Sequence, residues 1–331
     1  MAAQQNIYRS VVTAKFRTEN MMNFHEMIGD SADHNTIYMS IGRAEQWADN
    51  ESDPEFAPPY PNDDTDGVAD MWTQMIGATK VPGEMIDAIV PRKDWGDTRL
   101  PNPKIFYVND IVVVNSAPYN RTDVGKGWMV YRVVDVPNIG SCSISSITGK
   151  NECVRIGGIW TPTHESVEPP RGEANGIDMG DGYIWEYLYT IPPDVVINRC
   201  TNEHIVVPFP EELSEDPVRW GYDNVIKWYP NQFDLVYRMK VHSMRFRAYM
   251  DSLFFPQASL PGNRGFRQVS VIVNPLIKKS NPSEADTKAT AQYYSATQME
   301  PDSGQMIYME NRQPIIRSLD QTEEVSIIFE F

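Results

Sequence analysis

Cysteine is scarce in this sequence. Its 331 residues include only three cysteines, Cys142, Cys153 and Cys200. A secreted disulfide framework needs a denser and even-numbered set, so that class of protein is excluded. We therefore expect reduced thiols in a cytoplasm. Cys142 and Cys153 could close a small loop if oxidised, but their spacing alone does not decide between the two states.

Positive charge is also in short supply. Lys and Arg number 29 against 45 Asp and Glu, which gives a net charge of −16. A protein that binds nucleic acid needs cations that replace the counterions of phosphate. A protein that binds anionic membranes needs charge of the same sign. We expect neither nucleic acid nor membrane as a partner.

Long apolar runs are missing as well. No stretch of the sequence approaches the ~20 apolar residues that a membrane-spanning helix needs. The segment MAAQQNIYRS at the start lacks the apolar part of a secretory signal. We expect the chain to be made and folded in a cytoplasm.

The usual sequence motifs of catalysis and cofactor binding are absent. None of the five histidines is spaced like a zinc motif, and neither a phosphate-binding glycine loop nor a G-x-S-x-G elbow occurs. The segment NDDTDG (62–67) partly imitates a calcium loop, but its twelfth position is Thr73 rather than glutamate. We expect an aspartate-capped turn there, and no catalytic, cofactor-binding or metal-binding residues.

What the sequence does contain is alternating apolar residues. Val269, Val271 and Val273 share one face of an extended segment, which is typical of strands with one buried face. Strands are predicted at 35–42, 110–115, 127–136, 180–194, 203–208, 233–241, 244–251, 266–274, 305–310, 314–318 and 323–331. Many strands without regular helices between them favour a mainly β protein, a layered antiparallel β-sandwich with helix-bearing loop insertions.

Two helices are expected beside the strands. The first covers 18–28, with Thr18 as its N-cap, and the second covers 66–75, with Asp66 as its N-cap. We expect one domain over 1–331. Its long loop excursions lie near 44–79, 161–179 and 276–304.

The most aromatic stretch is GDGYIWEYLYTIPPD (180–194). Tyr183, Trp185, Tyr187 and Tyr189 have one parity, so a regular strand would carry all four on one face. They could fill a core, meet another protein or stack on a ligand. Because the opposite parity is also mostly apolar, we favour a core strand covered on both faces, with Trp185 buried and no small molecule stacked on it.

A second aromatic segment is RFRAY (245–249), in which arginines and aromatic residues alternate. This pattern could form a stacking platform for single-stranded nucleic acid. The acidic composition and the apolar alternation of the neighbouring residues favour a half-buried strand instead.

Longer segments, in a fixed order along the chain, carry a resemblance. They are FAPPYP (56–61), KDWGDTR (93–99), NDIVVVNSAPYN (109–120), GDGYIWEYL (180–188), IPPDVVINRCTNEHIVVP (191–208), RWGYDN (219–224), LPGNRGFRQVS (260–270), GQMIYMENRQPII (304–316) and LDQTEEVSIIF (319–329). Together they closely resemble the gene-product-eight family of baseplate wedge proteins in T-even-like, contractile-tailed bacteriophages.

The resemblance implies a structural virion protein rather than an enzyme. Members of this family are homodimers in the tail baseplate, contact other wedge proteins, and help to hold the baseplate in a metastable state until the sheath contracts. The resemblance implies no catalytic residue, cofactor or small-molecule substrate. It also implies a layered β-sandwich, in agreement with the strand pattern.

Two other functions stay open at this point. One is a carbohydrate-binding β-sandwich of a phage tail, in which the aromatic stretch would be exposed in a groove. The other is a hydrolase whose active-site residues are scattered along the chain, which needs a concave cluster of titratable side chains.

Overall fold

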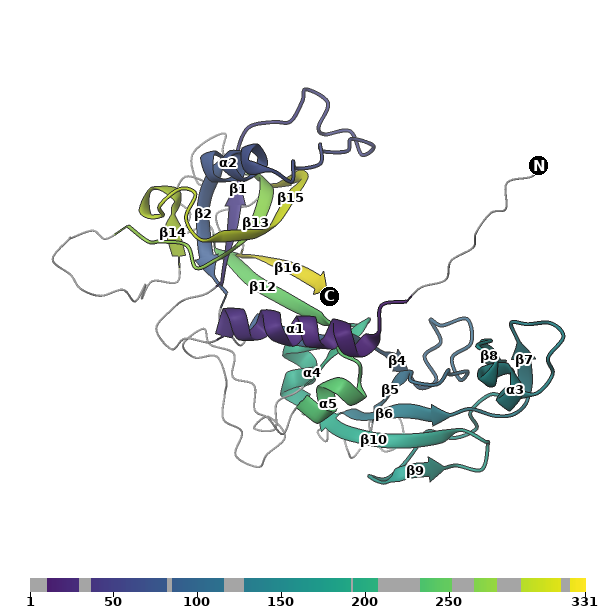
Figure 1. The fold of residues 1–331 in the computed structure, drawn as a ribbon. Helices are drawn as coiled ribbons and strands as arrows, with labels where there is room; N and C mark the ends of the chain where they lie inside the picture. Colours follow the sequence, from purple (N-terminus) through teal and green to yellow (C-terminus); the bar gives the residue numbers. More distant parts are fainter. Residues whose placement is uncertain are drawn as a thin grey trace, which may run out of the picture.

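The chain folds into stacked sheets whose described strands pair antiparallel with one exception, in a computed structural model (Figure 1). The structure describes residues 11–29, 37–81, 85–115, 128–191, 193–207, 233–251, 265–278, 293–316 and 322–331. The mainly β class predicted from the sequence is confirmed. Among these residues, no helix combines the length and the apolar character needed to cross a bilayer.

Three sheets contain most of the described strands. The first has the order β14 (Tyr293–Ser295), β2 (Met75–Lys80), β1 (Ile37–Gly42), β13 (Gly265–Val273), β15 (Gln305–Ile316). The second has the order β11 (His204–Val206), β3 (Ile86–Pro91), β12 (Ser243–Asp251), β16 (Thr322–Glu330). The third has the order β4 (Lys93–Asp94), β5 (Ile111–Asn115), β6 (Trp128–Asp135), β10 (Ile184–Ile191), β9 (Asn175–Asp178).

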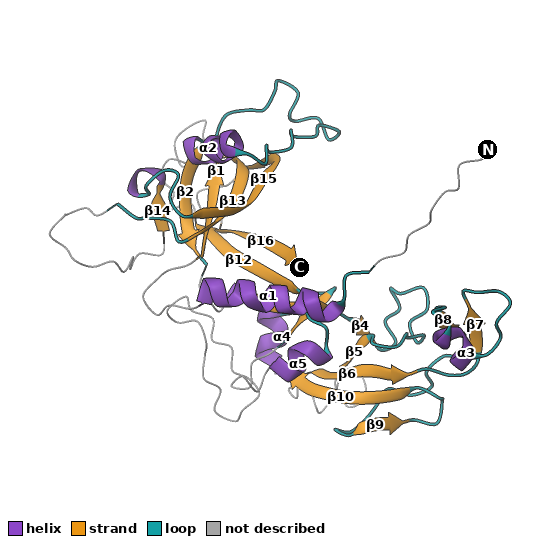
Figure 2. Ribbon diagram, viewed as in Figure 1, coloured by secondary structure: helices purple, strands orange, loops and turns teal. Residues whose placement is uncertain are grey.

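Short elements complete the fold. A two-stranded ribbon pairs β7 (Gly140–Cys142) with β8 (Trp160–Pro162). The helices are α1 (Ala14–Gly29), α2 (Thr65–Thr73), α3 (Lys150–Arg155), α4 (Pro193–Arg199), α5 (Phe233–Arg238) and the 3₁₀ turn η6 (Ala296–Gln298). Figure 2 shows α1, α4 and α5 in the middle of the molecule, with α2 on the first sheet and α3 near β7 and β8.

One apolar cluster joins the three large sheets, and we call it the main core. It includes Met39 of β1, Phe246 of β12 and Val113 of β5, each almost fully buried. In Figure 1 the strands β12 and β16 lie between the first and the third sheet. Burial of apolar surface between these layers is therefore the main stabilising contribution to the fold.

Two smaller clusters cover the outer faces of the sheets. On the first sheet, Tyr38 of β1 points away from the main core and packs on Tyr294, at 5.9 Å between ring centroids, within a cluster that includes Trp72 of α2. The outer face of the third sheet carries the outer core, which is built around Phe106, Tyr183 and Trp185. Strands in these two sheets are thus buried on both faces.

Both predicted helices exist, but both predicted caps are wrong. Helix α1 begins at Ala14, and the Thr13 hydroxyl accepts from the Phe16 N–H at 3.3 Å. Thr18 lies inside the helix, where its hydroxyl donates to the Ala14 carbonyl at 3.0 Å. A threonine fits either role, and the residues before it decide which one it takes.

Helix α2 begins one residue earlier than predicted and is capped by Asp64 instead of Asp66. The Asp64 carboxylate accepts from the Gly67 N–H at 2.9 Å. The turn before the helix is tight, because a Cβ on Gly67 would lie 1.9 Å from the Asn62 carbonyl oxygen. Met75, predicted to end this helix, begins β2.

Other sequence predictions fail at particular segments. The segment 233–241, predicted as a strand, contains the helix α5, whose buried Val236 lies three residues before Met239, a buried residue directly after the helix. The two strands predicted at 305–310 and 314–318 are one strand, β15, as far as Ile316. Pro314 is tolerated there because β15 is an edge strand and lies beside an irregularity in its pairing with β13.

The predicted excursions contain more regular structure than expected. Residues 75–79 of the first belong to β2, residues 175–178 of the second form β9, and the third contains β14 and η6. Residues 279–292 of the third excursion and residues 317–318 of a predicted strand lie outside the described residues.

Candidate functional site

The aromatic strand β10 does not present four rings on one face. Its pairing with β6 shifts between Tyr187 and Tyr189, so that Leu188 is an extra residue in the ladder. Tyr187 therefore packs on the outer core, whereas both Leu188 and Tyr189 pack on the main core. The prediction of a continuous ladder is wrong at Tyr189.

The prediction that Trp185 is buried is confirmed. Its exposed fraction is 0%, and the Phe106 ring lies edge-on to it at a centroid distance of 5.3 Å. The Tyr183 hydroxyl donates to the His164 carbonyl at 2.8 Å, and burial raises the pKa of Tyr183 to about 12. A ligand therefore has no open aromatic face here, which removes the observation that favoured carbohydrate binding.

The other face of β10 carries a buried carboxylate. Glu186 accepts a hydrogen bond from Arg132 Nε of β6 at 2.7 Å and another from Arg238 of α5. Burial opposes ionisation, but these two hydrogen bonds outweigh it and hold the pKa of Glu186 below its ordinary value. The site joins β6, β10 and α5 in one place.

A larger charge cluster lies in the second sheet around Asp87 of β3. The Asp87 carboxylate, with an exposed fraction of 0%, accepts from Arg199 Nε at 2.7 Å and from Arg245 Nη2 at 2.7 Å. Arg247 Nη2 lies 3.3 Å from the same carboxylate. Burial again opposes ionisation, and the three guanidinium groups lower the pKa of Asp87 below its ordinary value.

This cluster explains the RFRAY segment. The segment is a strand, β12, as predicted, and its apolar residues Phe246 and Ala248 face the main core. Arg245 and Arg247 are buried on the other face instead of pointing into solvent. The strand is therefore covered on both faces rather than half-buried, and its arginines are not available to stack on nucleotides.

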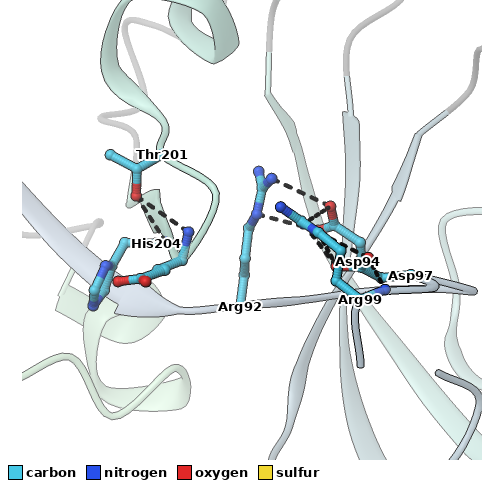
Figure 3. A network of polar contacts seen from close by, with 7 residues as sticks. Arg92, Asp94, Asp97, Arg99, Thr201 and His204 are labelled. Atoms are coloured by element: carbon cyan, nitrogen blue, oxygen red, sulfur yellow. Dashed lines mark hydrogen bonds and ion pairs between the residues drawn. The ribbon is translucent and has the colours of Figure 1, made fainter. Parts of the chain in front are cut away.

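A third polar network lies in the segment KDWGDTR, at the start of the third sheet (Figure 3). Arg92 Nε lies 3.1 Å from Asp94 Oδ1, and the guanidinium of Arg92 stacks 4.2 Å above the Trp128 ring. The Arg99 guanidinium donates two hydrogen bonds to the Asp97 carboxylate, from Nε at 2.9 Å and from Nη2 at 2.7 Å. Burial raises the pKa of Asp94 above its ordinary value.

The network connects the second and third sheets. The Arg92 N–H donates to the Glu203 carbonyl at 3.0 Å, and the His204 N–H of β11 donates to the Thr201 hydroxyl at 3.0 Å. Figure 3 shows Arg92 between the loop of Thr201 and the carboxylates of Asp94 and Asp97. These charges join elements of the fold, which is a structural role.

Cys142 and Cys153 form a disulfide, so the expectation of reduced thiols is wrong for this pair. The bond ties β7 to α3 across a sequence separation of 11 residues. Gly158 is required beside it, because a Cβ there would lie 2.8 Å from both sulfur atoms. Cys200 is a free cysteine, and burial raises the pKa of its thiol.

An open groove of about 620 Å³ lies between this disulfide-bonded segment and the end of β6. It is lined by Tyr107, Val108, Val134, Asp135, Val136, Lys150, Asn151, Val154, Arg155, Ile159 and Trp160. This lining contains no histidine, serine or cysteine, so it holds neither a Ser–His nor a Cys–His pair of a hydrolase, and its Asp135 and Lys150 are paired with each other. In the described part of the chain, no group of His, Cys, Asp and Glu is arranged to hold a metal ion.

Comparison with known proteins agrees with these observations. The family described as Phage-Gp8, Bacteriophage T4 Gp8, matches residues 10–331. The chain belongs to the phage Gp8 family. It is 57% identical over 328 residues to "Baseplate wedge protein gp8" of Enterobacteria phage T4, which covers 98% of each chain.

Membership of the Gp8 family makes the chain a structural component of the virion baseplate and not an enzyme. The family resemblance found in the sequence is therefore confirmed. Sequence reasoning did not single out Asp87 or Glu186. The available signal was an acidic residue between the apolar residues of IDAIVP and YIWEYL, because an acid at a core position needs a buried cation.

Proposed function

We propose that this chain builds the wedge of a contractile-tail baseplate, where it is bound by other wedge proteins and by a second copy of itself. In this role it contributes to wedge assembly and to the metastable state that changes when the sheath contracts. The observation that carries the proposal is the 57% identity, over 98% of both chains, to the T4 baseplate wedge protein.

The described fold supports a scaffold role. Its charged clusters at Asp87 and Glu186 are enclosed and bind parts of the same chain together. Several large apolar side chains lie outside the cores, among them Tyr60 at 96% and Ile197 at 79% exposed. Exposed apolar side chains of this kind suit contacts with neighbouring proteins.

A complementation experiment tests the proposal. A phage with a stop codon in the gene for this chain is grown with and without the chain supplied from a plasmid, and the tails are imaged. We expect complete, uncontracted baseplates only with the plasmid. Normal baseplates without the chain would contradict the proposed function, and baseplates that form but contract early would identify the metastable state as its contribution.

The second copy and the single domain are parts of the same proposal and have their own test. We expect the purified chain to sediment as a dimer at micromolar concentration, and to unfold in one transition because one main core joins its three large sheets. A monomer would contradict the dimer, and two separate transitions would contradict the single domain.

A further inference from the structure

The groove beside the disulfide has an apolar surface that nothing in the described chain covers. Val134, Val154 and Ile159 line it with exposed fractions of 43%, 62% and 68%. Val108 and Tyr107, from the loop before β5, add 47% and 39% on the same lining. Five exposed apolar residues around one groove are a concentration typical of an interaction site, whereas single ones elsewhere are ordinary.

The groove is preformed. Trp160 of the lining is buried, and its indole N–H donates to the Pro137 carbonyl at 3.0 Å. The ammonium of Lys150 lies 2.8 Å from Asp135 Oδ1 and donates to the Val136 carbonyl, which fixes α3 against the end of β6. Because the disulfide also ties α3 to β7, a partner would not have to order these walls on binding.

Among the described residues, one positively charged side chain on the groove lining has no ion-pair partner. Asp135 is paired with Lys150, and Asp110, next to Tyr107, is paired with Lys93 at 2.6 Å. Arg155 is exposed on the lining, and within the described residues no ion pair links it to Glu152 or to any other carboxylate. The groove therefore offers a positive group on a chain whose net charge is −16.

We propose that this groove receives a segment of a different baseplate protein, which inserts an aliphatic or aromatic side chain between Val154 and Ile159 and places a carboxylate on Arg155. The inference rests on the proposed function. A second copy of this chain fits less well, because two copies that meet at this groove would bring two Arg155 side chains together, whereas an acidic, apolar segment satisfies both features of the groove.

Substitutions on the groove lining test the proposal in the complementation experiment. We expect Val154→Asp and Arg155→Glu each to lower incorporation into purified wedges by about tenfold or more, the effect of losing an interface anchor. Arg171→Glu is the matched control, since Arg171 is also exposed but lies outside the groove and pairs with Glu168 at 3.7 Å. It should change incorporation by less than about twofold.

The outcomes separate this inference from the proposed function. If the wild-type chain itself does not enter wedges, the proposed function fails. If the wild-type chain enters and both groove variants enter equally well, the groove inference is overturned. The melting temperature of each purified variant shows whether it is folded. A variant that is lost from wedges and also melts at a lower temperature would count against the groove inference, because misfolding would explain the loss.

A photo-crosslinking amino acid at position 154 identifies the occupant in intact tails. We expect a cross-link to a protein of different sequence, near an Asp or Glu. Reversal of that acidic residue to lysine should restore incorporation of Arg155→Glu. A cross-link to a second copy of this chain, or no cross-link in assembled tails, would overturn the proposal.

Discussion

The main core and the disulfide module (residues 137–163) are stabilised in different ways. The main core collects apolar side chains from three large sheets and, in the described chain, contains no covalent cross-link. The module has only β7, α3 and β8, of three, six and three residues, and its buried side chains include Cys153 and Trp160. Elements this short bury little apolar surface, so a disulfide supplies part of the stabilising free energy that packing alone does not provide.

The two regions also differ in how far their apolar side chains are exposed to solvent. Side chains of the main core are enclosed by neighbouring layers, whereas the module leaves Val154 and Ile159 mostly exposed. Because the disulfide adds to the stability of the module, its folding depends less on these two exposed side chains. Val154 and Ile159 therefore remain available to contact a partner protein, whereas the apolar side chains of the main core do not.

The largest effect is expected at the buried charges of the second sheet. Asp87→Ala would leave Arg199, Arg245 and Arg247 buried without their carboxylate. We expect a loss of about 3–5 kcal/mol in the free energy of unfolding, measured by urea denaturation. The control Asp97→Ala removes an ion pair whose arginine is half exposed and should cost no more than about 1 kcal/mol. Equal losses would show that the Asp87 cluster contributes no more than a surface pair.

The next largest effect is expected in the module. Replacing Cys142 and Cys153 together by serine removes a cross-link over 11 residues, worth about 3 kcal/mol from loop entropy. Amide exchange should speed up most in β7, α3 and β8, which can open without the sheets, and less in β1 and β13, which exchange by global unfolding. The Cys200→Ser chain is the control. Equal acceleration in the module and in the sheets would contradict the separation of the two regions.

The free energy of unfolding is expected to depend on pH through a buried histidine of α1. Burial lowers the pKa of His25 in α1 from 6.5 to about 3. Below pH 6.5 the unfolded chain gains a proton at this histidine, while the folded chain gains it only near pH 3. The stability is thus complete above pH 6.5 and falls as the pH drops, by about 1.4 kcal/mol per unit, or roughly 2 kcal/mol at pH 5.

The histidine variants check this assignment. His25→Gln should flatten the dependence of the unfolding free energy between pH 6.5 and pH 5, whereas His164→Gln should not, because His164 is exposed. An unchanged slope in His25→Gln would show that other groups cause the pH dependence.

The smallest effect on stability is expected at the groove. Val154→Asp changes an exposed side chain, so the free energy of unfolding should move by less than about 0.5 kcal/mol. Thermal denaturation of the purified chain measures it. A loss of several kcal/mol would mean that Val154 serves the folding of the module after all, and the contrast between the two regions would disappear.

Local sequence patterns predicted the strands that alternate. β13 and β16 were found because one parity carries a regular series of apolar residues, whereas β2 (MIGATK) and β3 (IDAIVP) were missed because their apolar residues do not alternate regularly. The segment of α5 was taken for a strand, since a helix of six residues is too short for its period to stand out.

The charge clusters and the groove depend on contacts that are distant in sequence. Asp87 meets Arg199 and Arg245 across 112 and 158 residues, and no spacing rule connects positions so far apart. The disulfide was left open for a related reason, because its formation depends on how β7 and α3 pack. The absence of catalytic motifs and the family resemblance were readable from the sequence alone.

The extra residue Leu188 marks the place where β10 can change in length. Before it, β10 places Trp185 and Tyr187 in the outer core; after it, the strand places Tyr189 and Ile191 in the main core. Tyr187 and Tyr189 pair with the consecutive residues Tyr131 and Val130 of β6, so a chain without Leu188 would keep both pairs in a regular ladder. Loss of one residue at any other point of β10 would instead shift the following side chains to the opposite face and so to the wrong core.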